Sequence, residues 1–60
     1  MEKKLKILIV DGDVSEAEIL ESRLQTDFEV AGTAFDGVRA VEKIKGQLPD
    51  VVLIDIMLPQ

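Results

Sequence analysis

Apolar residues gather in short runs along this chain, and between the runs they recur at helical spacing. Two runs, 5–10 and 51–54, are almost wholly apolar, which is typical of strands covered on both faces in a parallel sheet. A third extended segment, 28–34, places Phe28 and Val30 on one side and polar or small residues on the other. That alternation predicts a half-exposed edge strand.

A helix is predicted over about 14–25, between the first two strands. Its apolar positions recur at spacings of three and four residues: Val14, Ala17, Leu20 and Leu24. Asp13 is a candidate N-cap, and Glu16 three residues later completes the pattern of a capping box. The acidic residues of its first turns also suit the positive end of the helix dipole.

A second helix is predicted over about 37–46, between the second and third strands. Its expected buried stripe consists of Val38, Val41 and Ile44, with Ala40 beside them. Asp36 can cap the start of this helix, Gly46 can end it, and Pro49 prevents it from resuming. The order is therefore strand–helix–strand–helix–strand, and this alternation predicts right-handed crossovers and a parallel α/β sheet.

Composition narrows the class of protein. The chain has 60 residues, and a domain of that size buries only about 60% of its unfolded surface. Cys and His are absent, so neither a disulfide nor an ordinary zinc site is available. The net charge of −5 argues against nucleic-acid binding by this segment. The apolar run after the N-terminal lysines is too short for a signal peptide and no segment is long enough to span a membrane, so we expect a cytoplasmic protein.

Acidic residues end two of the predicted strands and are the candidates for chemistry. Asp55 follows the run 51–54, and Asp11 follows the run 5–10, with Asp13 two residues further on. Parallel strands end at one rim of a sheet, where open α/β sheets place their ligand sites. Carboxylates brought together there repel one another. A hard divalent cation such as Mg²⁺ is the usual remedy.

Each of these carboxylates also has a structural explanation. Helix capping accounts for Asp13, and Asp11 and Asp55 are alternatively solvated turn residues at strand ends. A phosphate-binding loop is disfavoured, because the turn lacks both G-x-G-x-x-G and G-x-x-x-x-G-K-[ST]. An EF-hand is disfavoured too, because Glu16 stands at its sharp-turn position and Ser22 at its twelfth position.

Taken together, "KILIVDGD", the helix that follows it and "FEVAGTAFDGVRAVEKIKGQLPDVVLIDIMLP" resemble the N-terminal half of a response-regulator receiver domain from two-component signalling. The resemblance covers about residues 5–60, and its most specific pieces are "PDVVLIDIMLP" and the acidic turn after the first strand. It implies half of a flavodoxin-like doubly wound fold, with the three parallel strands in the order 2-1-3. Residues 1–60 would then be a partial receiver domain that stops after its third strand.

The resemblance also implies a function and the residues for it. Asp55 would accept a phosphoryl group from a histidine kinase or a phosphotransfer protein, which makes the chain a phosphoacceptor rather than an enzyme. Mg²⁺ would be held by Asp11, by Asp55 and by the backbone carbonyl of Met57, with Asp13 as a further candidate. The cation would neutralise the phosphoryl oxygens while the carboxylate attacks in line.

Two departures from the family pattern lower the expected activity. The second acid after the first strand is replaced by Gly12, which has no ligand atom, so we expect weak Mg²⁺ binding. Asp13 would substitute for it only by bending the turn. The family's Ser/Thr after the fourth strand and Lys after the fifth are absent from these 60 residues. We therefore expect an impaired unit.

The rival hypothesis is a non-catalytic one, in which the chain is a self-associating fold fragment or an engineered half-domain. In the order 2-1-3 the third strand, 51–54, lies at an edge of the sheet, where an apolar strand invites pairing. We therefore expect a homo-oligomer, with a dimer favoured, in which two copies of this strand pair antiparallel across a two-fold axis. Packing through the exposed helix faces is the alternative dimer.

Overall fold

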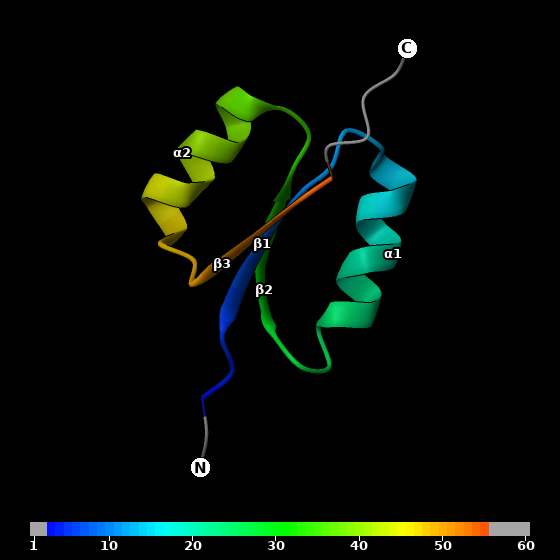
Figure 1. Cartoon of the computed structure of the whole chain (residues 1–60), viewed down its shortest axis with the longest axis vertical. Coiled ribbons are helices and arrows are strands. Elements are labelled where there is room, and N and C mark those ends of the chain that lie inside the picture. The colour runs from blue at the N-terminus through cyan, green and yellow to red at the C-terminus, as the bar shows by residue number, and fades with distance from the viewer. Residues whose placement is uncertain (1–2, 56–60) are drawn as a thin grey trace.

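The computed structural model of the chain describes residues 3–55 (Figure 1). Within that range the elements are β1 (Lys6–Val10), α1 (Val14–Leu24), β2 (Glu29–Ala34), α2 (Gly37–Gln47) and β3 (Val51–Ile54). All five were predicted from the sequence, and no boundary differs from its prediction by more than one residue. Neither of the described helices has the length and apolar character needed to cross a membrane.

The strands form one parallel sheet in the order β2-β1-β3, which confirms the predicted half of a flavodoxin-like fold. The central strand β1 carries most of the core, because Ile7 is 3% exposed and Leu8 and Ile9 are 0% exposed. A strand with neighbours on both edges and helices over both faces has no solvated side, which explains its continuous apolar run.

The outer strand β2 is an edge strand, as the segment 28–34 predicted. Its register against β1 shifts between Ile7, which pairs with Val30, and Leu8, which pairs with Gly32. One residue of β2 is therefore left over, as in a β-bulge. The strand is half-buried over most of its length, and its last residue, Ala34, is buried.

The two helices lie on opposite faces of the sheet (Figure 1), as right-handed crossovers in opposite directions require. Small residues make the close approach to the sheet: Ala17 of α1 is 1% exposed and Ala40 of α2 is 7% exposed. Both helices cover β1 and β2, and no Cα atom of either helix lies within 8 Å of a Cα atom of β3. The third strand is thus attached to the fold through β1.

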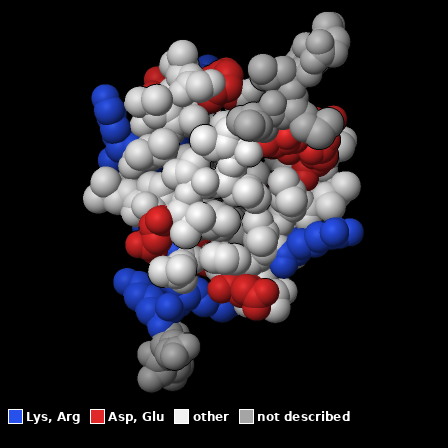
Figure 2. Space-filling model, viewed as in Figure 1, with Lys and Arg blue, Asp and Glu red and all other residues white. Residues whose placement is uncertain are grey.

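The apolar stripes of the helices are less buried than predicted. On α2, Val38 is 70% exposed, Val41 is 50% exposed and Ile44 is 36% exposed; on α1, Val14 is 53% exposed. Figure 2 shows a broad surface without charged residues in the middle of the molecule, with the charged residues around it. The prediction of a buried stripe was wrong because the helices sit over two strands only. Among the described residues, no other element covers the part of each stripe that remains exposed.

The end of α2 also differs from the prediction, since Gly46 lies inside the helix and Gln47 is its last residue. Leu48 closes the helix in the left-handed conformation, with φ 51° and ψ 59°, and its N–H donates to the carbonyl of Ile44 at 2.9 Å. Proline disfavours a helical conformation in the residue before it. Pro49 therefore places the turn on Leu48.

Candidate functional site

Three carboxylates meet at the carboxyl end of the sheet. Asp11 directly follows β1, Asp55 directly follows β3, and Glu16 lies in the first turn of α1. One carboxylate oxygen from each of them lies within 4.8 Å of those of the other two. The structure thus brings together the two strand-end acids that the sequence predicted, and it adds Glu16 to them.

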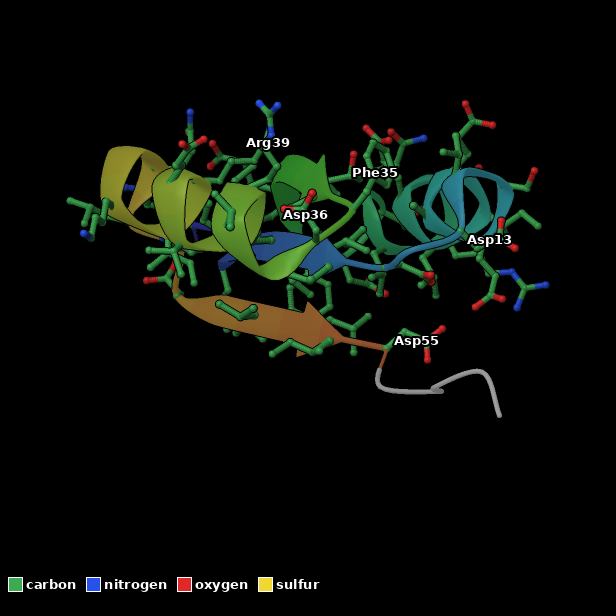
Figure 3. All side chains as sticks on the ribbon, turned by 90° about the horizontal axis from the view of Figure 1, so that it is seen from above. Asp13, Phe35, Asp36, Arg39 and Asp55 are labelled. Atoms are coloured by element: carbon green, nitrogen blue, oxygen red, sulfur yellow. The ribbon has the colours of Figure 1, made fainter. Side chains whose placement is uncertain are left out.

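Main-chain hydrogen bonds of the sheet hold the two aspartates side by side. The last residue of β1, Val10, pairs with Ile54 at the end of β3. Beyond this pair, the Asp55 N–H donates to the Val10 carbonyl at 2.9 Å, and the Asp11 N–H donates to the Ala34 carbonyl at 2.9 Å. Both residues therefore belong to the rigid end of the sheet. Figure 3 shows Asp55 beyond the end of β3 and Asp13 at the start of α1, at the same end of the molecule.

Asp11 is a buried carboxylate with one oxygen left over. Its side chain is 2% exposed. Oδ1 accepts the Asp13 N–H at 2.9 Å, whereas Oδ2 has no hydrogen-bond partner among the described residues. A carboxylate oxygen that is shielded from water and has no partner is costly. Oxygen is the ligand that hard divalent cations prefer, so the residues present fit such a cation.

Glu16 was predicted to complete a capping box, but only half of that box forms. The Glu16 N–H donates to Oδ1 of Asp13 at 3.1 Å, so Asp13 caps α1 as predicted. The Asp13 N–H, which the Glu16 side chain would bond in a capping box, donates to Asp11 instead. The Glu16 carboxyl turns to the other acids. A hydrogen bond with Asp55 and the negative charges of Asp11 and Asp55 raise its pKa to about 7, and burial and a hydrogen bond to Asp11, which only the protonated Glu16 can donate, add to the rise.

The other residues considered as ligands lie elsewhere or have other partners. Asp13 is not one of the three clustered acids, and its Oδ1 is used in capping. Gly12 has no side chain, and a Cβ atom there would lie 3.9 Å from the Phe35 carbonyl oxygen, which is an ordinary van der Waals contact. Met57, whose carbonyl the resemblance implied as a ligand, lies outside the described residues.

The three clustered acids differ in their exposure to solvent. Asp11 is buried, Asp55 is half-buried and Glu16 is exposed. Among the three acids, Glu16 is therefore the most accessible to solvent and Asp11 the least.

Comparison with known proteins finds no matching family model, but it finds relatives that align with nearly all of the chain. The chain is 43% identical over 60 residues to the probable transcriptional regulator ycf27 of Guillardia theta, covering 100% of this chain and 24% of that protein. It is 35% identical over 54 residues to the response regulator PleD of Caulobacter vibrioides, covering 90% and 12%.

A third relative is named as an enzyme and not as a regulator. The chain is 36% identical over 62 residues to a protein-glutamate methylesterase/protein-glutamine glutaminase of Pyrococcus horikoshii, covering 100% of this chain and 17% of that protein. The chain thus spans less than a quarter of the length of these three relatives.

Proposed function

We propose that this chain is a phosphoacceptor module in which Asp55 accepts the phosphoryl group. The chain is homologous to response regulators and has the topology of the N-terminal half of a receiver domain. One observation carries the proposal: the buried Oδ2 of Asp11 has no hydrogen-bond partner among residues 3–55 and lies at the edge of the sheet where Asp55 follows β3. A buried carboxylate oxygen kept without a partner is costly for a structural residue, and it is expected of a cation ligand.

The chemistry assigned to Asp55 is a transfer of one phosphoryl group. A carboxylate oxygen of Asp55 forms a bond to phosphorus while the bond between phosphorus and the donor breaks, and the donor keeps that electron pair. The donor is a phosphohistidine of a histidine kinase or phosphotransfer protein, and its imidazole is the leaving group. If the imidazole leaves as an anion, its nitrogen takes a proton from solvent. A divalent cation at this site would neutralise charge on the phosphoryl oxygens.

Asp11 and Asp55 are the residues of the predicted set that we assign to Mg²⁺, together with the backbone carbonyl of Met57 that the resemblance implies. We assign Asp13 to capping, because its Oδ1 accepts the Glu16 N–H. Gly12 contributes no side-chain oxygen to the turn after β1. For that reason we propose a weak Mg²⁺ site and a slow phosphorylation reaction.

Labelling by a small phosphodonor tests this function. The chain is incubated with acetyl phosphate and Mg²⁺, its intact mass is followed over time, and the modified residue is mapped by mass spectrometry. We expect slow addition of one phosphoryl group at Asp55, no addition when EDTA removes the cation, and no addition to Asp55→Asn. Labelling that persists in Asp55→Asn would overturn the assignment, as would the absence of labelling at high Mg²⁺ concentration.

Self-association through β3 is a second candidate function, and the exposure of β3 favours it. Val51 is 36% exposed, Leu53 is 38% exposed and Ile54 is 55% exposed. Neither helix has a Cα atom within 8 Å of this strand, and Figure 3 shows it projecting from the rest of the fold. Because an apolar edge strand is a template for pairing, we propose a homodimer in which two β3 strands meet.

A further inference from the structure

The turn after β1 supplies one carboxylate to the clustered acids, and that carboxylate is already partly used. Oδ1 of Asp11 accepts the Asp13 N–H at 2.9 Å, which leaves Oδ2 for a cation. Gly12 has no side-chain oxygen to bind a cation, and Oδ1 of Asp13 accepts the N–H that caps α1. A cation held by the aspartates of β1 and β3 alone would therefore have few protein oxygens around it.

Glu16 brings a further carboxylate to the same place from a different element. An oxygen of Glu16 lies within 4.8 Å of an oxygen of Asp11 and of an oxygen of Asp55. Two hydrogen bonds connect the start of α1 to the buried acid, since the Glu16 N–H donates to Asp13 and the Asp13 N–H donates to Asp11. A ligand carried on a helix that is tied to the sheet in this way is well positioned.

We infer that Glu16 is a direct Mg²⁺ ligand in this chain and replaces the acid that Gly12 lacks. The inference rests on the proposed function, because it concerns the same cation. A group of acidic side chains would not be evidence by itself. The independent observation is the buried Oδ2 of Asp11, which has no hydrogen-bond partner among the described residues when Glu16 is ionised.

Calorimetric titration with Mg²⁺ tests the inference on the unphosphorylated chain. Glu16→Gln keeps the size of the side chain and the backbone N–H that bonds Asp13, and it should weaken Mg²⁺ binding by about tenfold or more. Glu18→Gln is the matched control, because Glu18 is an exposed acid of the same helix outside the cluster. The loss of the Glu18 charge should change the Mg²⁺ affinity by less than about twofold, since an exposed charge outside the cluster is screened by solvent and salt.

A rescue experiment separates a ligand role from a general effect of charge. Gly12→Asp in the Glu16→Gln background should recover most of the lost affinity, because the nearest described atom to a Cβ at position 12, apart from its chain neighbours, is the Phe35 carbonyl oxygen at 3.9 Å. The same Gly12→Asp change in the otherwise unaltered chain should give a smaller gain, since neighbouring groups that serve one function are not additive.

The outcomes distinguish this inference from the proposed function. Equal Mg²⁺ affinities for Glu16→Gln and Glu18→Gln, with the unaltered chain binding Mg²⁺ and becoming labelled at Asp55, would overturn the role of Glu16 alone. No Mg²⁺ binding and no labelling in the unaltered chain would overturn the proposed function as well. Far-ultraviolet circular dichroism and the Mg²⁺-induced rise in melting temperature provide readouts that do not depend on phosphorylation.

Discussion

At the scale of single residues, Asp11 combines a carboxylate with almost complete burial, and we predict that removing its charge stabilises the cation-free chain. Its side chain is 2% exposed, and Oδ2 has no partner. Asp11→Asn keeps an oxygen for the Asp13 N–H and places an amide beside Glu16 and Asp55, which can accept from it. We expect the free energy of unfolding to rise by about 1 kcal/mol and Mg²⁺ binding to be abolished.

Urea unfolding of the Asp11→Asn chain, with and without Mg²⁺, measures both effects. Asp36→Asn is the control, because Asp36 caps α2 through Oδ1, lies outside the acidic cluster and is replaced by an equally good cap. It should alter neither stability nor Mg²⁺ binding. A loss of stability in Asp11→Asn without Mg²⁺ would mean that the carboxylate is already satisfied in the apo chain.

Glu16 should make the stability of the cation-free chain depend on pH. Its pKa is raised from 4.5 to about 7 by the hydrogen bond with Asp55 and by the charges of Asp11 and Asp55. Below 4.5 Glu16 is protonated in both the folded and the unfolded chain. As the pH rises from there the unfolded chain loses this proton first, so stability falls until the folded chain has lost it too, above about 7.

Melting temperatures measured in EDTA between about pH 4 and pH 8 test this dependence. Glu16→Gln should flatten the decline and melt at a higher temperature than the unaltered chain at the upper end of the range. Glu18→Gln, with an exposed acid of the same helix removed, should keep the decline. If the Glu16→Gln and unaltered chains gave parallel profiles, the interaction between Glu16 and the aspartates would be absent in solution.

The sequence was sufficient to predict that Asp11 and Asp55 lie close together, because each follows an apolar run directly and the end of a parallel strand determines where its residue lies. It was not sufficient for Glu16, whose spacing from Asp13 fits a capping box equally well. Whether Glu16 completes the capping box or joins the acidic cluster depends on which acceptor the Asp13 N–H bonds. In the structure this N–H donates to Asp11. The available signal was an acid in the first turn of a helix that begins at the carboxyl edge of the sheet.

At the scale of elements, periodicity predicted where the helices lie but not how deeply they are buried. The apolar spacing of Val38, Val41 and Ile44 identified one face of α2, yet these residues are exposed. Periodicity reports which face of a helix is apolar, whereas burial requires a surface to receive that face. Among the described elements, α2 packs on β1 and β2 but not on β3, and this surface leaves the three residues exposed.

The end of α2 offers a prediction at this scale. Leu48 adopts φ 51° and ψ 59°, and its side chain is 76% exposed. An L-residue in the left-handed region pays for the position of its Cβ atom, and glycine does not. Leu48→Gly should therefore raise the free energy of unfolding by about 1 kcal/mol, because the N–H bond to Ile44 is retained and little packing is lost.

Thermal unfolding of Leu48→Gly and of Leu48→Ala separates the two contributions. Leu48→Ala removes most of the side chain but keeps Cβ, so it should show no gain. If Leu48→Gly were less stable than Leu48→Ala, the left-handed conformation would not be the source of strain and the entropy of the glycine would dominate.

At the scale of the whole molecule, apolar surface remains uncovered on several elements. Within residues 3–55, the exposed large apolar side chains are Leu5, Val14, Ile19, Phe35, Val38, Val41, Ile44, Leu48, Val51, Leu53 and Ile54. Figure 2 shows the surface without charged residues that faces the viewer. Exposed apolar side chains that gather into one patch mark an interaction site, and burying apolar surface contributes about 25 cal/mol per Å².

We predict that this surface makes the chain self-associate at micromolar concentration, with β3 as the contact. Sedimentation equilibrium should give a mass above that of the monomer. Leu53→Lys should shift the chain toward the monomer, because a charged side chain on an edge strand opposes pairing. Val38→Lys is the control, since Val38 is an exposed apolar residue on α2, away from the strand. Circular dichroism checks that both variants remain folded.

The two variants also decide between the two dimers. If β3 pairs with its copy across a two-fold axis, Leu53→Lys dissociates the assembly and Val38→Lys leaves it intact. If the helix faces form the contact, Val38→Lys dissociates it and Leu53→Lys has the smaller effect. A folded monomer at micromolar concentration in the unaltered chain would refute self-association altogether. It would mean that the uncovered strand and helix faces are tolerated in water despite the roughly 25 cal/mol per Å² that burial would contribute.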